Sequence, residues 1–534
     1  MKLAPRTYQI VWDAHAWVGV VASLLLHVMF FMGAFALFHA ELDRWAEPAL
    51  ARPVAVERTP AWPSEPSLLP AAALRPTPMP KLQPLLQQLD FERPLSGAQR
   101  VAFIAEAAGL RAYVSRDGAF TEYHYAPSSG TLEQAESNLG SFLYSMHYLG
   151  PLPYGVWIAG LASMALLLAL VTGVLIHLKD LLRQWFQFRP ERVARTWTSD
   201  LHKVLGVFGL PYQLLYAWTG AVLCLGYLVV QPLFVELVSG GNERALAEAR
   251  GDFGAELEPT GQRLQALPDI DALVATAERR WPSLQPTWVG LEHVGDEAST
   301  LTLYGDLPGH AFGAVDLVLR ARDGSLLAVH GLEDAGVYRR FEAWFFGLHY
   351  AQFGGYGIKL LYALLAFATC AVIISGNLVW LARRDPLRER RGQRVLERVT
   401  VGIGAGVVPA TACAFSANRL LPHALHSSQS SWEQGVFWGV WAAALALSLV
   451  WHAPRRVSSV ALGLGGITWL ALVPLELASP TGAFADPLER GVLLGLGVLG
   501  AASLAAGHYL WHARAARPAP AAPLEASLSS SAGE

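Results

Sequence analysis

Charge and cysteine are both scarce in this 534-residue chain. Charged residues make up 16% of the sequence, against roughly 25% in a soluble domain, and 53% of the residues are hydrophobic. This composition excludes a soluble multidomain enzyme and favours several membrane spans in a lipid bilayer. The net charge of −3 gives no general attraction to nucleic acid, so no nucleic-acid partner is expected.

The three cysteines, Cys224, Cys370 and Cys413, lie in apolar runs and form no C-x-x-C pair. Their number and spacing exclude a disulfide framework, a structural zinc site and a four-cysteine iron–sulfur cluster. The sequence also lacks a P-loop, an H-E-x-x-H motif and a nucleophile elbow. The GIGAG run at 402–406 lies inside an apolar helix with no preceding strand, so binding of NADPH is not expected.

Eight charge-free runs are long enough to cross a bilayer, which takes about 20 residues. The sequence therefore predicts an all-α polytopic membrane protein with about eight transmembrane helices. The predicted spans are 16–38, 152–178, 204–232, 358–382, 399–418, 434–453, 457–475 and 491–513.

Arginine and lysine in the short loops predict the orientation of these spans. Basic residues gather at 178–203, at 383–398, at Arg455 and Arg456, and after the last span. All of them fall on one side of the membrane if both termini are cytoplasmic. The long segments 40–146 and 236–348 are then external.

Each external segment is predicted to contain a small α+β module. In the first, residues 48–95 are proline-rich and are expected to form an extended linker, and 97–109 are expected to be helical. A hairpin is predicted to turn at Asp117-Gly118. The second segment has the same plan, with a helix at 271–280 and a hairpin that turns at Asp323-Gly324.

An internal repeat relates the two halves of residues 1–384. HAWVG at 15–19 matches HKVLG at 202–206, MHYLGPLPYG matches LHYAQFGGYG, and VTGVLIHLK matches ISGNLVWLA. The duplicated two-helix units are expected to form a four-helix core, and the last four spans an appended bundle. The predicted organisation is helix 1 at 1–40, a linker and first module at 41–146, helices 2–3 at 147–235, a second module at 236–348, helix 4 at 349–384, a C-terminal bundle at 385–513 and a disordered tail at 514–534.

Four histidines occupy repeat-equivalent positions. His15 and His202 start helices at the cytoplasmic face, and His147 and His349 lie at the external face. Neutral imidazole is a good iron ligand, and haem takes two axial ligands from opposite faces, so each pair is a candidate set of axial ligands. The alternative is that each histidine forms a hydrogen bond between helices or lies at the headgroup level.

Repeated glycines accompany these histidines. Gly19 and Gly206 lie one turn after His15 and His202, and Gly33 and Gly220 lie toward the external end. They are predicted to give clearance for a porphyrin. The alternative is close helix packing without a cofactor.

Three further histidines, His27, His39 and His177, belong to the same core but not to the repeat. Successive members of His15, His27 and His39 are turned about 120° from one another, so they cannot all face one haem. His27 is at membrane depth and needs a partner, so it is a ligand, a relay or a hydrogen-bonded core residue. The pairs His423/His426 and His508/His512 are weaker metal-binding candidates.

The motifs HAWVG, MHYLG, DLHKVLGVFGLP and ISGNLVWLARR resemble those of the PepSY-associated transmembrane-helix family over about residues 10–385. That family includes ferric-siderophore reductases of the bacterial inner membrane. The resemblance implies PepSY-like periplasmic modules, two b-type haems (haem b) held by the histidines, and transfer of electrons across the membrane to a ferric siderophore or other ferric chelate. The electron donor would be a quinol or a cytoplasmic reductase. HAW in place of His-Arg-Trp, and the four extra spans, depart from the family pattern.

Two other functions compete with a haem-containing ferric reductase. The first is a membrane-anchored PepSY protein that regulates or inhibits a peptidase without redox activity. The second is a transporter, which only the eight spans favour.

Overall fold

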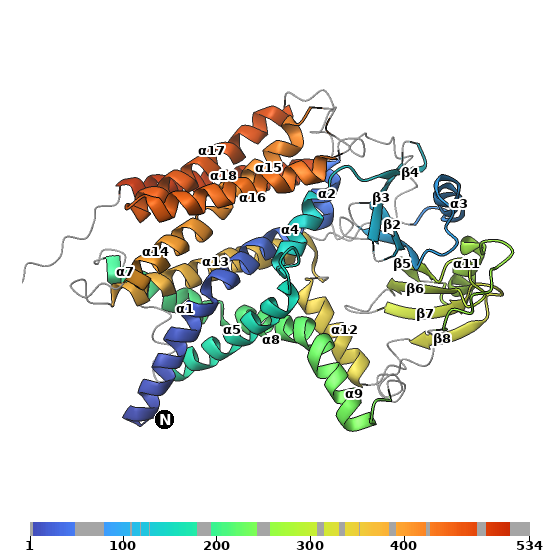
Figure 1. The fold of residues 1–534 in the computed structure, drawn as a ribbon, viewed down its shortest axis with the longest axis horizontal. Helices are drawn as coiled ribbons and strands as arrows, with labels where there is room; N and C mark the ends of the chain where they lie inside the picture. Colours follow the sequence, from blue (N-terminus) through green and yellow to red (C-terminus); the bar gives the residue numbers. More distant parts are fainter. Residues whose placement is uncertain are drawn as a thin grey trace, which may run out of the picture.

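The protein is divided into a helical body and a β-sheet that lies at one end of it (Figure 1). The computed structural model describes residues 4–47, 79–178, 194–242, 257–306, 314–330, 337–383, 391–477 and 487–512, apart from positions 107, 108, 118, 128, 283, 352, 423, 424, 426 and 427. We call the end of the helical body beside the sheet the sheet end. The opposite end, where α13 finishes and α14 begins, is the basic end (Figure 1).

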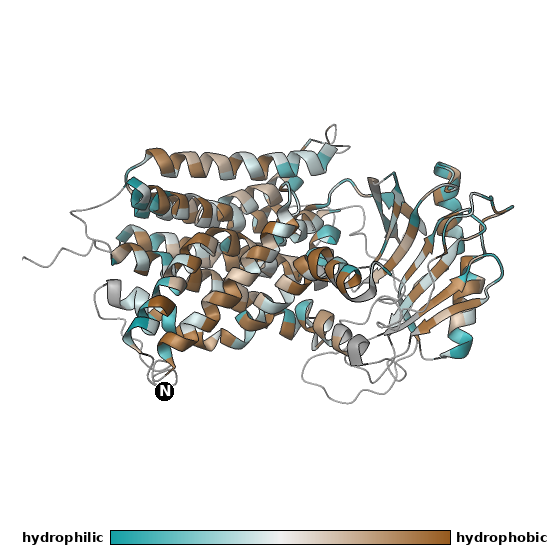
Figure 2. Cartoon of the chain, turned by 60° about the horizontal axis from the view of Figure 1, so that its bottom comes forward, coloured by the Kyte–Doolittle hydropathy of each residue, from teal (hydrophilic) through white to brown (hydrophobic). Residues whose placement is uncertain are grey.

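Within these residues, seven helices are long and apolar enough to cross a bilayer, and a bent pair provides an eighth crossing. The seven are α1 (Pro5–Ala36), α5 (Gly155–His177), α13 (Gly355–Ala382), the consecutive α14 (Arg391–Gly404) and α15 (Val407–Leu420), α16 (Gln429–Val450), α17 (Pro454–Leu477) and α18 (Pro487–His512). Hydrophobic residues predominate along the helices of this body, and hydrophilic residues gather at its ends and on the sheet (Figure 2). The prediction of a polytopic membrane protein is confirmed.

The bent pair replaces the single span predicted at 204–232. Helix α7 (Ala194–Phe208) and the helix that follows it are inclined at 69° to one another across Gly209. Pro211 lies in the first turn of α8 (Leu210–Ala221), where its missing N–H is tolerated, whereas in a continuous helix its ring would clash with the preceding turn. The chain continues as a π-helix, η3 (Val222–Val230), and then as α9 (Gln231–Ser239).

Four crossings form the predicted core. Helix α1 packs against α5 and α13, α5 packs against α8, and α13 packs against α7. The two repeat units therefore interlock. The C-terminal helices α14–α18 pack on one side of this core, where α14 contacts both α1 and α13.

Eight antiparallel strands form one sheet. Its order is β4-β3-β2-β1-β5-β6-β7-β8. The strands are β1 (Arg100–Glu106), β2 (Gly109–Arg116), β3 (Ala119–Ala126), β4 (Thr131–Gln134), β5 (Gln285–Glu292), β6 (Thr300–Asp306), β7 (Ala314–Arg320) and β8 (Leu326–His330). Each of the two long segments between the spans supplies four strands, as two modules would, but β1 pairs with β5 and joins them. The two modules thus share one sheet and one core.

The helix expected at 97–109 is wrong. Residues 100–106 form β1, a central strand in which Val101 and Phe103 are fully buried. A short apolar run with no clear period is compatible with either a helix or a strand. Here residues 100–106 form a strand because they hydrogen-bond to β2 on one side and to β5 on the other. The helix of this module is instead α3 (Gln83–Glu92), which lies inside the segment expected to be an extended linker and buries Leu85, Leu86 and Leu89.

Both predicted hairpins are confirmed. The β2–β3 turn places Asp117 at φ 50°, and the β7–β8 turn places Gly324 at φ 69°. The helix predicted at 271–280 is α11 (Ile270–Arg280). Some predictions concern residues outside those that the structure describes. These are the predictions for residues 48–78, for most of the 178–203 loop, for His423 and His426, and for the tail after 512.

Candidate functional site

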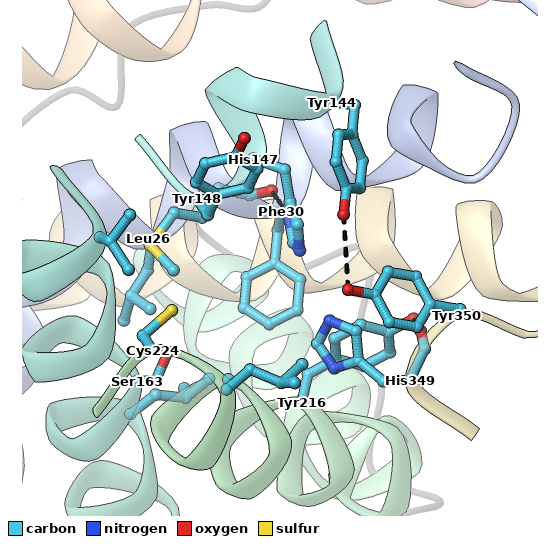
Figure 3. A pocket seen from close by; sticks show the side chains of 15 residues that line it. Leu26, Phe30, Tyr144, His147, Tyr148, Ser163, Tyr216, Cys224, His349 and Tyr350 are labelled. Atoms are coloured by element: carbon cyan, nitrogen blue, oxygen red, sulfur yellow. Dashed lines mark hydrogen bonds between the residues drawn. The ribbon is translucent and has the colours of Figure 1, made fainter. Parts of the chain in front are cut away.

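His147 and His349 meet at the sheet end of the core. His147 ends α4 (Leu139–His147), and His349 ends α12 (Val337–His349). Their ring centroids are 6.1 Å apart, and the ring planes are inclined at 48°. We call them the sheet-end pair. Both side chains enter a cavity of about 280 Å³, near the lower limit of about 300–1,000 Å³ for small-molecule sites (Figure 3).

The helix that carries His147 is held at its first turn by Asp43 of α2 (His39–Ala46). The Asp43 carboxylate accepts hydrogen bonds from the Ser141 backbone N–H at 3.0 Å and from the Ser141 hydroxyl at 2.7 Å. Burial, helped by nearby Glu122, raises the pKa of Asp43 to about 7. Asp43 thus caps the first turn of the helix whose last residue is His147.

The two imidazoles of the sheet-end pair each use Nδ1 for a hydrogen bond. His147 Nδ1 lies 2.7 Å from the Met29 carbonyl oxygen, which can only accept. His349 Nδ1 lies 2.7 Å from Thr219 Oγ1. The Thr219 hydroxyl donates its proton to the Leu215 carbonyl, so towards His349 it acts as an acceptor. Both Nδ1 atoms therefore carry the proton.

Within the described residues, no hydrogen bond occupies Nε2 of either ring. A neutral imidazole with its proton on Nδ1 has a lone pair on Nε2. Each ring of the sheet-end pair is thus in the tautomer that a metal ligand needs, and its Nδ1 contact fixes the ring orientation.

His15 and His202 form a second pair at the basic end, with ring centroids 6.3 Å apart and planes inclined at 70°. We call them the basic-end pair. His15 Nδ1 donates to the Ala169 carbonyl and His202 Nδ1 to the Val372 carbonyl, each at 2.8 Å. The sequence prediction that repeat-equivalent histidines lie at one depth agrees with this arrangement. Their role as ligands remains a prediction.

Three glycines lie directly against the paired histidines. A Cβ built at Gly33 would stand 2.8 Å from His147 Nδ1, one at Gly173 3.1 Å from His15 Cε1, and one at Gly376 3.0 Å from His202 Cε1. Sequence reasoning selected Gly33 but missed Gly173 and Gly376. Their signal was present in the repeated V-T-G and I-S-G, where each glycine follows a hydroxyl residue.

The other glycines chosen from the sequence have different surroundings. A Cβ at Gly19 would meet nothing within 4 Å, and one at Gly206 only Val372 at 4.0 Å. Gly220 lines the cavity of the sheet-end pair, and its Cβ would meet the Ser163 hydroxyl. None of the three contacts a paired histidine, and their role in porphyrin clearance stays a prediction.

The three histidines outside the repeat lie elsewhere. His27 Nε2 faces the Gly404 carbonyl of α14 at 3.3 Å, which puts its proton on Nε2 and directs the ring toward the C-terminal helices. His39 Nδ1 hydrogen-bonds to the Ala36 carbonyl, and its ring packs on Tyr144. His177 ends α5 at the basic end. His27 is thus a hydrogen-bonded residue between helices.

Two facing imidazoles suit iron that already has four other ligands. Two nitrogen–metal bonds of about 2 Å each, plus the radius of each ring, separate imidazole centroids by roughly 6 Å. Both pairs have this separation. Among the described residues, no group of three or more His, Cys, Asp or Glu side chains is placed to hold a bare metal ion. Two facing imidazole nitrogens are the donor set that fits haem, whose porphyrin supplies the other four nitrogens.

The lining of the cavity also suits a macrocycle. It is mainly apolar, and its polar side chains include two tyrosines whose hydroxyls are 3.4 Å apart, Tyr144 and Tyr350 (Figure 3). Tyr216 lines the same cavity and donates a hydrogen bond to the His349 carbonyl at 2.7 Å, which fixes the end of α12. An apolar enclosure with a few placed hydroxyls is typical of a cofactor site.

Fold and site together define a multi-pass membrane protein with a duplicated four-helix core and a histidine pair at each end. The sequence matches the family described as PepSY-associated TM region over residues 12–383, and the chain belongs to this family. One relative, the uncharacterized protein PA4219 of Pseudomonas aeruginosa, is 30% identical over 381 residues, which cover 68% of this chain and 92% of the relative. The family match ends before the C-terminal helices α14–α18.

Proposed function

We propose that the protein is a transmembrane electron carrier that reduces the ferric iron of a siderophore or other ferric chelate. The observation that carries the proposal is the geometry of the two histidine pairs, in which four Nδ1 atoms are hydrogen-bonded and the rings of each pair are about 6 Å apart. The haem b bound by each pair would supply one-electron transfer between ferrous and ferric iron. Fe(II) binds oxygen-rich chelators weakly, so reduction would release the metal.

The residues of the chain have distinct tasks in this proposal. His147 and His349 would hold one haem at the sheet end, and His15 and His202 would hold the other at the basic end. Met29, which fixes His147, lies 14 residues beyond His15 on α1, a distance of about 21 Å at roughly 1.5 Å per residue. The two sites would therefore span most of a hydrocarbon core of about 30 Å.

The distribution of arginine supports an orientation. Arg383 stacks over Trp12 near the start of α1, and Arg391, Arg394 and Arg398 lie in the first turns of α14. The start of α14 lies at the end opposite the sheet (Figure 1). By the positive-inside rule, we place the basic end at the cytoplasmic face of the bacterial inner membrane and the sheet in the periplasm, where the ferric chelate would be reduced.

Spectroscopy of the purified protein tests the proposal. Protein from haem-replete cells should show the sharp reduced bands of low-spin, six-coordinate haem, at about two haems per chain. His349→Ala should remove the sheet-end haem, keep the basic-end haem and abolish reduction of an external ferric chelate. A colourless wild-type protein would overturn the redox function and leave the regulatory PepSY reading.

A matched variant at the other end separates the two sites. His202→Ala should remove the basic-end haem and keep the sheet-end haem. If His349→Ala retains two six-coordinate haems, the proposed pairing is wrong and His27, His39 and His177 become the candidates.

A further inference from the structure

The two histidine pairs differ in one contact. Three of the four paired histidines donate Nδ1–H to a backbone carbonyl, at Met29, Ala169 and Val372. His349 instead donates to a side-chain hydroxyl, that of Thr219, at 2.7 Å. The hydroxyls nearest Nδ1 of His15 and His202, those of Thr172 and Ser375, are farther away, at 3.4 and 3.5 Å. The duplicated core is therefore asymmetric at the sheet end.

The sequence explains why the asymmetry exists. When Gly33 and Gly220 are aligned, Thr219 corresponds to Met32, which has no hydroxyl. In the same alignment, the backbone carbonyl of Met29 corresponds to the backbone carbonyl of Tyr216. The ring of Tyr216 instead packs 4.8 Å from the His349 ring, and its hydroxyl holds the His349 carbonyl. Thr219 is itself fixed, because it donates to Leu215 at 2.7 Å and is 1% exposed.

The acceptor of Nδ1–H changes the electronic character of an imidazole ligand. A strong acceptor draws the proton away from the ring, makes Nε2 more basic and stabilises the ferric state of bound iron. An amide carbonyl oxygen carries more negative charge than an alcohol oxygen. His349 is therefore the weakest electron donor of the four, and both histidines of the basic-end pair have the stronger kind of acceptor.

From this contact we propose that Thr219 is a positioning residue that sets the sheet-end site at a higher reduction potential than the basic-end site. The inference rests on the proposed haem function. If His15 and His202 hold one haem and His147 and His349 the other, transfer of one electron from the basic end to the sheet end would oxidise Fe(II) to Fe(III) at the first site and reduce Fe(III) to Fe(II) at the second, with no proton moved. The difference in potential favours electron flow toward the sheet.

Potentiometric titration of the full-length holoprotein tests the inference. The wild-type protein should be reduced in two steps, and the step at higher potential should be the one missing from His349→Ala. Thr219→Val keeps the side-chain shape but removes the acceptor, so it should raise the sheet-end potential further and leave the basic-end potential unchanged. Thr219→Ser restores the hydroxyl and should return the sheet-end potential toward the wild-type value.

The control variant is Ser375→Ala at the basic end. The Ser375 hydroxyl is 3.5 Å from His202 Nδ1, which keeps its carbonyl partner at 2.8 Å, so this variant should shift neither potential. An equal or lower sheet-end potential in the wild type would overturn the inference, as would a Thr219→Val protein with two haems and unshifted potentials. Those outcomes leave the haem function standing, whereas a protein without haem overturns both.

Discussion

Gly33 on α1 lies directly against the imidazole of His147 on α4. A Cβ at this position would stand 2.8 Å from His147 Nδ1, closer than real Cβ contacts allow. The same nitrogen donates to the Met29 carbonyl one turn earlier on α1. The backbone of α1 therefore accepts a hydrogen bond from the His147 ring at Met29, and the lack of a side chain at Gly33 gives space for that ring.

Gly33→Ala should displace His147 and disturb the sheet-end site. We expect haem content to fall from about two to about one per chain, with loss of the component that His349→Ala also removes. Gly357→Ala on α13 is the matched control, because a Cβ there meets nothing within 4 Å and alanine stabilises a helix by roughly 0.5–1 kcal/mol over glycine. Pyridine haemochrome analysis of both variants gives the result, and a Gly33→Ala protein with full haem content would contradict it.

His27→Leu should keep both haems. The His27 ring contacts Gly404 rather than another histidine, so its removal costs a buried hydrogen bond worth about 1 kcal/mol and weakens the contact between α1 and α14. The melting temperature in detergent should fall slightly, and the reduced spectrum should stay as in the wild type. Loss of one haem in this variant would make His27 an axial ligand.

The stability of the sheet end should decrease as the pH rises from 3.8 to about 7. Asp43 has a pKa raised from 3.8 to about 7, so the folded protein binds its proton more tightly than the unfolded chain does. This contribution to stability is fully present below pH 3.8 and is lost as the pH rises toward about 7. The wild-type protein should therefore melt at a lower temperature at pH 8 than at pH 5.

Asp43→Asn mimics the neutral carboxyl and should reduce that difference. Asp43→Ala, which cannot accept from Ser141, should be less stable at both pH values, by about 0.5–2 kcal/mol for loss of a helix cap. Glu47, whose pKa burial also raises to about 7, should keep part of the pH dependence in either variant. An unchanged pH dependence in Asp43→Asn would show that Asp43 does not titrate in this range.

The orientation can be tested with reporter fusions. Fusions after residues 110, 190, 290 and 390 should report periplasm, cytoplasm, periplasm and cytoplasm in turn. The first and third positions belong to the sheet segments, and the other two follow in sequence after α5 and α13, which end at the basic end. A periplasmic signal at 190 would reverse the proposed direction of electron flow.

The repeat was the strongest guide in the sequence, because it predicted which histidines would come together. His147 and His349 are 202 residues apart, yet equivalence within a duplicated unit places them at one depth. The strand at 100–106 was missed because a short apolar run carries no information about its distant partner β5. Thr219 was missed for a related reason, since only the packing of α8 on α12 brings its hydroxyl to His349.

The pairing of β1 with β5 has a consequence for how such a protein is assembled. One repeat unit alone would carry a single histidine for each site and an unpaired β1 edge. Two separate copies related by a twofold axis would complete both histidine pairs and close that edge, in an interface whose strength depends on concentration. Covalent linkage of the two units makes the same association intramolecular. Linkage also allows the sequences of the two repeat units to diverge, so that the second unit has Thr219 at the position where the first has Met32.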